Sequence, residues 1–281
     1  MKLPVLPTYY YLDHFLEMLS FVAATYALIL DKTHQTFISE FRHFPTDEQC
    51  LFVRMVNRRG HIFEPAAFKY PEIADVGMAI QGLVRRGYLR KLREEDYAAW
   101  LCVLTKARLL DIARSAGCEN VKSSWAKPRL IDHLLTEVPF AVAVRQTCAA
   151  SHLALDRTEP REFLLYLYFG KTREDLKSFA LRDLGILRVN DATAFKSRFS
   201  NAAEAKACFF YGQLLDTLAV PTEATFEAAA RKLGEAPDGG GEYATTLRER
   251  AVFRIGQFFE KRKDAERAIQ LYRAAPSPDC K

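Results

Sequence analysis

The 281-residue sequence has few of the residue groupings from which metal or nucleophilic chemistry is usually built. Its six cysteines are far apart and form no C-x-x-C pair, and its six histidines form no H-E-x-x-H or H-x-x-x-H group. This spacing argues against a zinc site or a disulfide framework and favours free thiols in a reducing compartment. We therefore expect a cytoplasmic protein that has no catalytic and no metal-ligating residues within these 281 positions.

A long hydrophobic run is also lacking. The most apolar stretch, LSFVAATYALIL, is twelve residues long and is interrupted by Ser20 and Thr25, whereas a membrane-spanning helix needs about 20 apolar residues. Pro4, Pro7 and Asp13 do not suit a signal peptide, so we expect neither a signal peptide nor a membrane partner.

Positive charge is present, and it is concentrated. The whole chain has a formal net charge of +5. Between Ile80 and Leu135 there are eleven Lys and Arg against six Asp and Glu, so one fifth of the chain accounts for the whole excess. A local basic field favours a polyanion such as nucleic acid, although a well-solvated surface gives the same count.

The first hundred residues predict helices and a small strand. A capping box at Thr46 and Gln49 predicts a helix over CLFVRMVNRRG. A second helix is predicted over ADVGMAIQGLVRRG, with Val84 among its inward residues, and YLRKL alternates as a strand does. The pattern predicts a winged-helix-like domain over residues 1–104, and the alternative is an ordinary helical domain with a solvated Arg-rich face. The candidate DNA-binding residues of this domain are Arg54, Arg58, Arg59, Arg85 and Arg86.

Residues 105–137 predict a helical hairpin. Thr105 can cap a first helix that Gly117 ends, and Pro128 suits the start of a second helix. The second helix carries an apolar stripe of Leu130, Ile131, Leu134 and Leu135. Cations at the hairpin favour an anionic partner, because the start of a helix offers free N–H groups and the positive end of its dipole. The candidate DNA-binding residues here are Lys106, Lys122, Lys127 and Arg129.

The remaining chain predicts a connector over 138–200, with a possible strand at LGILRV, and a helical region over 201–281. Near its end, small and large residues stand at the spacing of a tetratricopeptide repeat, although Val252 replaces the usual Trp. The positions concerned are Ile255, Gly256, Phe259, Ala268, Tyr272 and Ala275. Because a single repeat leaves one face without a neighbour, we expect this region to be truncated at residue 281.

Four segments together resemble the Fanconi-associated nucleases of the VRR-NUC type: YYYLDHFLEMLSFV, LFVRMVNRRGHIF, the hairpin, and REFLLYLYFGKTREDLKSFALRDLGILR. The resemblance is to the amino-terminal part of a bacterial member. It implies a mainly α fold, in which a winged-helix-like domain carries a SAP-like hairpin and is followed by helical repeats and a carboxy-terminal nuclease domain. It also implies 5′-flap endonuclease and exonuclease activity and interstrand cross-link repair. Mg or Mn would act in the nuclease domain.

The chain departs from the family in its chemistry. A nuclease of the PD-(D/E)xK type holds metal with an acidic pair and uses a Lys of an E-x-K strand; no such strand is recognisable, and TREDLK lies in a helical, charge-rich context. We therefore expect the DNA-binding and scaffolding part of a structure-selective repair nuclease. Its partners would be branched or 5′-flap duplex DNA and the nuclease domain, in a bacterial cytoplasm and at the nucleoid during repair. The alternatives are a non-catalytic architectural or regulatory DNA-binding protein and a helical-repeat scaffold for protein interactions.

Overall fold

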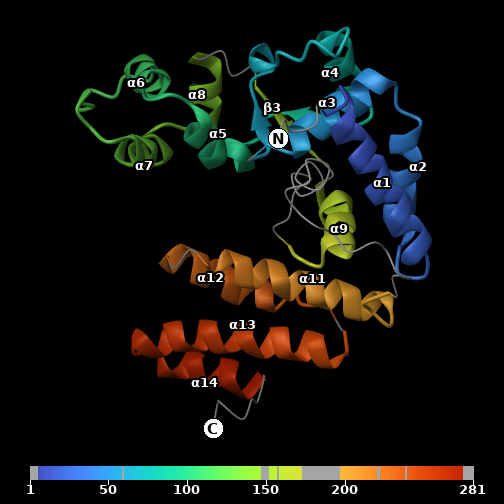
Figure 1. The fold of residues 1–281 in the computed structure, drawn as a ribbon. Coiled ribbons are helices and arrows are strands. Elements are labelled where there is room, and N and C mark those ends of the chain that lie inside the picture. Colours follow the sequence, from blue (N-terminus) through green and yellow to red (C-terminus); the bar gives the residue numbers. More distant parts are fainter. Residues whose placement is uncertain are drawn as a thin grey trace, which may run out of the picture. The chain divides into compact units, whose positions relative to one another are not determined.

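The chain is mainly helical, as the sequence predicts, and it contains one small sheet (Figure 1). The computed structural model describes residues 6–58, 60–146, 152–156, 158–172, 197–219, 222–237 and 239–274. Two compact units are distinguished. Unit 1 comprises Met1–Pro4, His14–His43 and Glu159–Lys281, and unit 2 comprises Val5–Asp13 and Phe44–Thr158. The domain boundaries expected at 104, 137 and 200 stay a prediction. No helix in the described part of the chain is both long and apolar enough to cross a bilayer.

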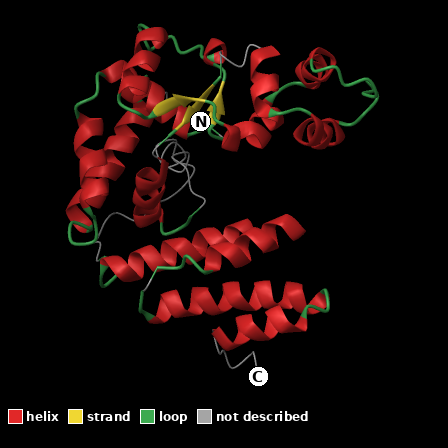
Figure 2. Ribbon diagram, turned by 180° about the vertical axis from the view of Figure 1, so that it is seen from behind, coloured by secondary structure: helices red, strands yellow, loops and turns green. Residues whose placement is uncertain are grey.

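Unit 2 contains a winged-helix-like arrangement of helices and three strands. Its elements are α3 (Thr46–Val56), β1 (Ile62–Phe63), η1 (Pro65–Ala67), α4 (Val76–Arg85), β2 (Leu89–Lys91) and β3 (Leu153–Leu155). The strands form one small sheet among the helices (Figure 2). β3 is its central strand and runs antiparallel to both neighbours, with Ile62 opposite Ala154 and Leu89 opposite Leu155. The strand predicted after Gly87 is β2, which confirms the local prediction.

The helices of this arrangement form where the sequence predicts them, but two details differ. Thr46 is the first residue of α3 rather than its cap. The cap position is Pro45, whose ring has no hydrogen-bond acceptor, so the predicted capping box is wrong. On α4, Asp75 caps the helix by accepting from the N–H of Met78. Val84 is 42% exposed, so its predicted inward position is also wrong.

The paired strands β2 and β3 form the wing of this fold. The helical hairpin lies between these two strands in the chain. The chain leaves β2 through η2 (Glu94–Asp96), α5 (Tyr97–Val103), α6 (Lys106–Ser115), α7 (Lys127–Glu137) and α8 (Phe140–Gln146) before it returns as β3. One hydrophobic cluster contains Trp100 of α5, Leu109 of α6 and Leu130 of α7 together with Ile62 and Ala154 of the sheet. The hairpin is therefore packed on the sheet and is an insertion between two paired strands.

The hairpin itself follows its sequence signals closely. The Thr105 hydroxyl accepts from the N–H of Arg108 at 3.3 Å, and Gly117 has a φ of 77° just after α6. A left-handed φ favours glycine, so position 117 ends the helix as predicted. Leu130 and Leu134 of α7 are fully buried, but Leu135 is 42% exposed and does not belong to the inward stripe.

The remaining helices are α1 (Tyr10–Thr25), α2 (Lys32–Arg42), α9 (Thr158–Phe169), α11 (Ala202–Thr217), α12 (Glu223–Leu233), α13 (Glu242–Lys261) and α14 (Ala265–Ala274). The carboxylate of Asp31 caps α2 by accepting from the N–H groups of Thr33 and His34. In unit 1, Phe163 of α9 packs against the rings of His34 and Phe209. The predicted strand LGILRV lies outside the described residues.

The helices α13 and α14 pack as a pair at the positions that the repeat spacing indicates (Figure 1). Gly256 of α13 lies against the ring of Tyr272 of α14, so that a Cβ at position 256 would overlap that ring. Phe259 of α13 and Ala268 of α14 are both buried. Ala275 lies outside the described residues. A small residue thus faces a large one, as in a tetratricopeptide-like pair.

Candidate nucleic-acid interface

The cationic end of the hairpin lies at the start of α7. Lys127 donates through Nζ to the backbone carbonyl of Cys102 at 2.6 Å. The guanidinium carbon of Arg129 lies 4.1 Å from the centre of the Trp125 ring, and the ring of His133 meets Trp125 edge-on. Lys122 is exposed. None of these three cations forms an ion pair with a described carboxylate, so all of them remain available to an anionic ligand.

Lys106 stands at the start of α6 and is half-buried, and it too has no carboxylate partner among the described residues. Its neighbour Arg108 differs, since its guanidinium forms a bidentate pair with Glu64 at 3.0 and 2.8 Å. The hairpin therefore combines free cations with a cation that is used within the protein.

The two arginines that end α4 have different surroundings. Arg85 is exposed and forms no ion pair with any described residue. Arg86 donates through Nε to Glu48 of α3 at 2.8 Å, and its guanidinium lies 4.7 Å from the centre of the Phe44 ring. Because Glu48 is buried, Arg86 stabilises the contact between α3 and α4. A part for Arg86 in DNA binding stays a prediction.

Arg54 of α3 is also engaged within the protein. Its guanidinium donates to Glu72 at 2.9 Å through Nε and lies 3.9 Å from the centre of the Tyr11 ring. Glu72 also accepts from the hydroxyl of Tyr11 at 2.9 Å. Burial alone would raise the pKa of the Glu72 carboxyl, but hydrogen bonds from the backbone, Arg54 and Tyr11 outweigh it and hold the pKa below its usual value.

Arg58, one turn further along, has no carboxylate partner in the described part of the chain. Its guanidinium carbon lies 5.4 Å from the ring centres of both Phe68 and Tyr70. The predicted site residue Arg59 lies outside the described residues. The predicted cations thus fall into two sets: Arg54 and Arg86 are paired with buried carboxylates, whereas six others lack a described carboxylate partner. These six, called the free cations below, are Arg58, Arg85, Lys106, Lys122, Lys127 and Arg129.

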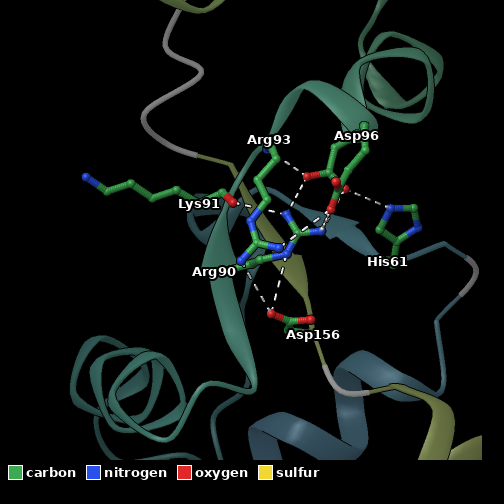
Figure 3. Close-up of polar contacts among 7 residues, drawn as sticks. His61, Arg90, Lys91, Arg93, Asp96 and Asp156 are labelled. Carbon is green, nitrogen blue, oxygen red and sulfur yellow. Dashed lines mark hydrogen bonds and ion pairs between the residues drawn. The ribbon is translucent and has the colours of Figure 1, made fainter.

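An ionic cluster at the base of the wing was not predicted from the sequence. It consists of His61, Arg90, Asp96 and Asp156 and is called the wing-base cluster below (Figure 3). Burial alone would raise the pKa of the Asp96 carboxyl. Hydrogen bonds from the Arg90 guanidinium and the Arg93 N–H outweigh this and hold the pKa below its usual value. Only the density of charges in RKLREED hints at such a cluster, and spacing does not reveal that Asp96 is buried.

The described residues contain no group of three or more His, Cys, Asp or Glu side chains that could hold a metal ion. They therefore do not fit the metal site that the family resemblance implies for the nuclease domain. The arrangement they offer is a set of cations on the winged-helix-like arrangement and its inserted hairpin, which suits binding to phosphates.

Comparisons with known proteins agree with this arrangement. Residues 9–90 match the model of the FAN1 helix-turn-helix domain. A Fanconi-associated nuclease 1 homolog of Pseudomonas aeruginosa is 29% identical over 98% of this chain and 49% of its own length. The homolog of Oryza sativa subsp. japonica is 26% identical over 63% of this chain and 20% of its own length.

Two crystal structures of paFAN1 bound to 5′-flap DNA with a gap are similar to this structure at 26% identity. The match to the structure with a flap of two nucleotides covers 99% of this chain and 51% of the paFAN1 chain, with a TM-score of 0.78. The match to the structure with a one-nucleotide flap covers 98% of this chain and 51% of the paFAN1 chain, with a TM-score of 0.81. The chain spans about half the length of the bacterial relative it matches. It is thus a relative of the Fanconi-associated nucleases along nearly all of its length, as its sequence indicates.

Proposed function

We propose that this chain is the DNA-binding and scaffolding part of a structure-selective DNA repair nuclease that acts on 5′-flap DNA and on interstrand cross-links. The observation that carries the proposal is the structural match to paFAN1, which extends over 98–99% of this chain. The paFAN1 protein was crystallised on 5′-flap DNA with a gap. The proposed setting is the cytoplasm of a bacterium, at the nucleoid during repair.

The free cations support the binding step. Each phosphate that a Lys or Arg neutralises releases condensed counterions, so every contact adds about 0.9 to the slope of log affinity against log salt. Contacts of this kind fix the position of the protein on DNA without reading the sequence of bases. Selectivity for DNA structure then depends on how the cations are arranged in space, which is the property that a scaffold controls.

We assign phosphodiester hydrolysis to a nuclease domain of the PD-(D/E)xK type, with Mg or Mn as its metal. The strands of the described residues carry no E-x-K sequence, and those residues contain no group of side chains that could hold a metal ion. We therefore expect the 281-residue chain to bind flapped DNA without cutting it. Metal-dependent cleavage that disappears when a carboxylate within the chain is mutated would contradict this assignment.

The test is a binding titration over a range of salt concentrations with a gapped 5′-flap DNA and a continuous duplex of the same length. We expect tighter binding to the flap. The double variant Lys127→Ala/Arg129→Ala should weaken binding and lower the salt slope by nearly 2, which is about 0.9 for each lost contact. A matched control removes two exposed cations from α13, Arg250→Ala/Lys261→Ala, and should change the slope less. An unchanged slope in the hairpin variant would exclude the hairpin from the DNA surface.

A further inference from the structure

The hairpin is built into the wing of the helix-turn-helix unit, so both of its connections to the unit pass through one place. The chain leaves the sheet after Lys91 and re-enters it at Leu153, and these two residues lie opposite each other in paired strands. The strand β2 itself follows directly on α4, which carries Arg85. The orientation of the hairpin relative to α4 therefore depends on how the chain is held at this base.

The wing-base cluster holds the outgoing connection against the sheet (Figure 3). Arg90 of β2 donates through Nη1 to Asp96 at 2.5 Å and through Nη2 to the other oxygen of the same carboxylate at 3.2 Å. The Nε atom of Arg90 lies 3.5 Å from Asp156, which immediately follows β3. His61, which immediately precedes β1, lies 3.4 Å from Asp96. The Arg90 guanidinium and the Asp96 carboxylate thus link β2 and the outgoing connection to residues that flank β1 and β3.

Because the Arg90–Asp96 pair is buried, it can fix the relative orientation of the segments that it joins. The side chains of Asp96 and Arg90 are only 3% and 15% exposed. A planar guanidinium that meets a carboxylate through two bonds fixes orientation as well as distance. Arg108 and Glu64 form another link between the hairpin and the sheet, but their side chains are 44% and 29% exposed. An exposed pair contributes little rigidity, because solvent screens it and its side chains are free to move.

Direct contacts lead from the cluster to the cationic end of the hairpin. Asp96 is the cap residue of α5, and the next residue, Tyr97, donates its hydroxyl to the carbonyl of Val138 at the end of α7, at 2.9 Å. At the other end of α5, the carbonyl of Cys102 accepts from Lys127 at the start of α7. Both ends of α7 are therefore bonded to α5, whose first turn follows the buried carboxylate.

We propose that the wing-base cluster is a positioning device that fixes the inserted hairpin relative to α4, so that Arg85 and the hairpin cations bind two backbone segments of one DNA molecule at the same time. The inference rests on the DNA-binding function proposed above. Asp96 and Arg90 contact no DNA and act through Lys127 and Arg129. Holding the second contact in place raises its effective concentration, which multiplies affinity without any new contact.

The test places Asp96→Asn in two backgrounds, the natural chain and the hairpin variant Lys127→Ala/Arg129→Ala, and measures binding to gapped 5′-flap DNA. In the natural background we expect affinity to fall about tenfold or more and the salt slope to fall toward that of the hairpin variant. In the hairpin variant, which keeps fewer hairpin cations to position and lacks the bond from Lys127 to Cys102, Asp96→Asn should reduce affinity by a clearly smaller factor. The matched control is Asp111→Asn, which removes one negative charge from an exposed carboxylate of α6.

Equal weakening in both backgrounds would show a general structural effect and overturn the proposal, as would unchanged affinity in both. A hairpin variant that binds as tightly as the natural chain would contradict the hairpin's part in the proposed function, and this inference would fall with it. Circular dichroism verifies that each variant is folded. If Asp96→Asn does not fold, Asp156→Asn weakens the cluster instead, by removing a charge that lies beside Arg90. The effect of Asp156→Asn on affinity is then compared between the natural chain and the hairpin variant, with the same outcomes for and against the proposal.

Discussion

Gly82 of α4 lies directly against the carboxylate of Glu48 in α3, with no room for a Cβ between them. Glu48 is buried and paired with Arg86, so it cannot turn away without losing that pair. We expect Gly82→Ala to lower the free energy of unfolding by about 1–3 kcal/mol, because overpacking outweighs the gain in helix propensity. Urea unfolding measures this, with the exposed Gln81→Ala on the same helix as the control. A more stable Gly82→Ala variant would show that α3 and α4 separate readily.

The neighbouring residues Arg85 and Arg86 should affect different measurements. Arg86→Ala leaves the buried Glu48 without its partner, so we expect a loss of about 1–3 kcal/mol in the free energy of unfolding. Arg85→Ala removes a free cation from the surface. We expect it to leave stability within about 0.5 kcal/mol and to lower the salt slope of DNA binding by about 0.9. Urea unfolding measures the stability of both variants, and a DNA-binding titration over a range of salt concentrations measures their salt slopes. Equal changes of stability and of salt slope in the two variants would contradict this assignment.

Local signals allow much of the fold to be predicted. Thr105, Gly117 and Pro128 fix the ends of the hairpin helices, because capping and glycine conformation act within a few residues. The insertion of the hairpin into the wing could not be predicted in this way. It depends on β3, which is three residues long and pairs with strands far away in the sequence. A strand that short carries almost no periodic signal.

The sequence predicts which cations belong to the candidate site, but it does not predict which of them are paired with carboxylates. Sequence spacing places Arg54, Arg58, Arg85 and Arg86 on helices that face solvent. It cannot show that Arg54 meets Glu72 or that Arg86 meets Glu48, since those carboxylates lie on other elements. Counting charges therefore overestimates the free cations of the helix-turn-helix part. On the hairpin the count holds better, because the carboxylates near Lys122, Lys127 and Arg129 do not pair with them.

The stability contributed by Asp96 should disappear in acid. Its pKa in the folded chain is below the usual value, which is about 3.9 in an unfolded chain. A carboxyl with a lowered folded pKa stabilises fully above the unfolded pKa, and its contribution is lost as pH falls through the folded pKa. We expect Asp96→Asn to cost about 3 kcal/mol at pH 7, where Arg90 loses a buried partner, and clearly less at pH 3.

Urea unfolding of the natural chain and of Asp96→Asn at both pH values measures this difference. Asp111→Asn serves again as the control, because Asp111 is exposed and its loss should have little effect at either pH. A difference between Asp96→Asn and the natural chain that stayed constant from pH 7 to pH 3 would mean that packing, and not the charge of Asp96, stabilises the wing base.

The contact between Gly256 and Tyr272 gives a prediction for the tetratricopeptide-like pair. A methyl group at position 256 would overlap the Tyr272 ring, so Gly256→Ala should lower the free energy of unfolding by about 1–3 kcal/mol. Tyr272→Phe, the control, removes only a hydroxyl that donates to the exposed Glu260, and we expect a change below about 0.5 kcal/mol.

The double variant Gly256→Ala/Tyr272→Ala separates steric overlap from other effects. Removing the ring makes room for the methyl group, so the double variant should be more stable than the sum of the two single changes implies, by about 0.5–3 kcal/mol. Tyr272→Ala alone provides the fourth corner of this cycle. Additive effects would show that the two residues do not press on each other, and α13 and α14 would then have to pack without the small-against-large contact that defines the repeat.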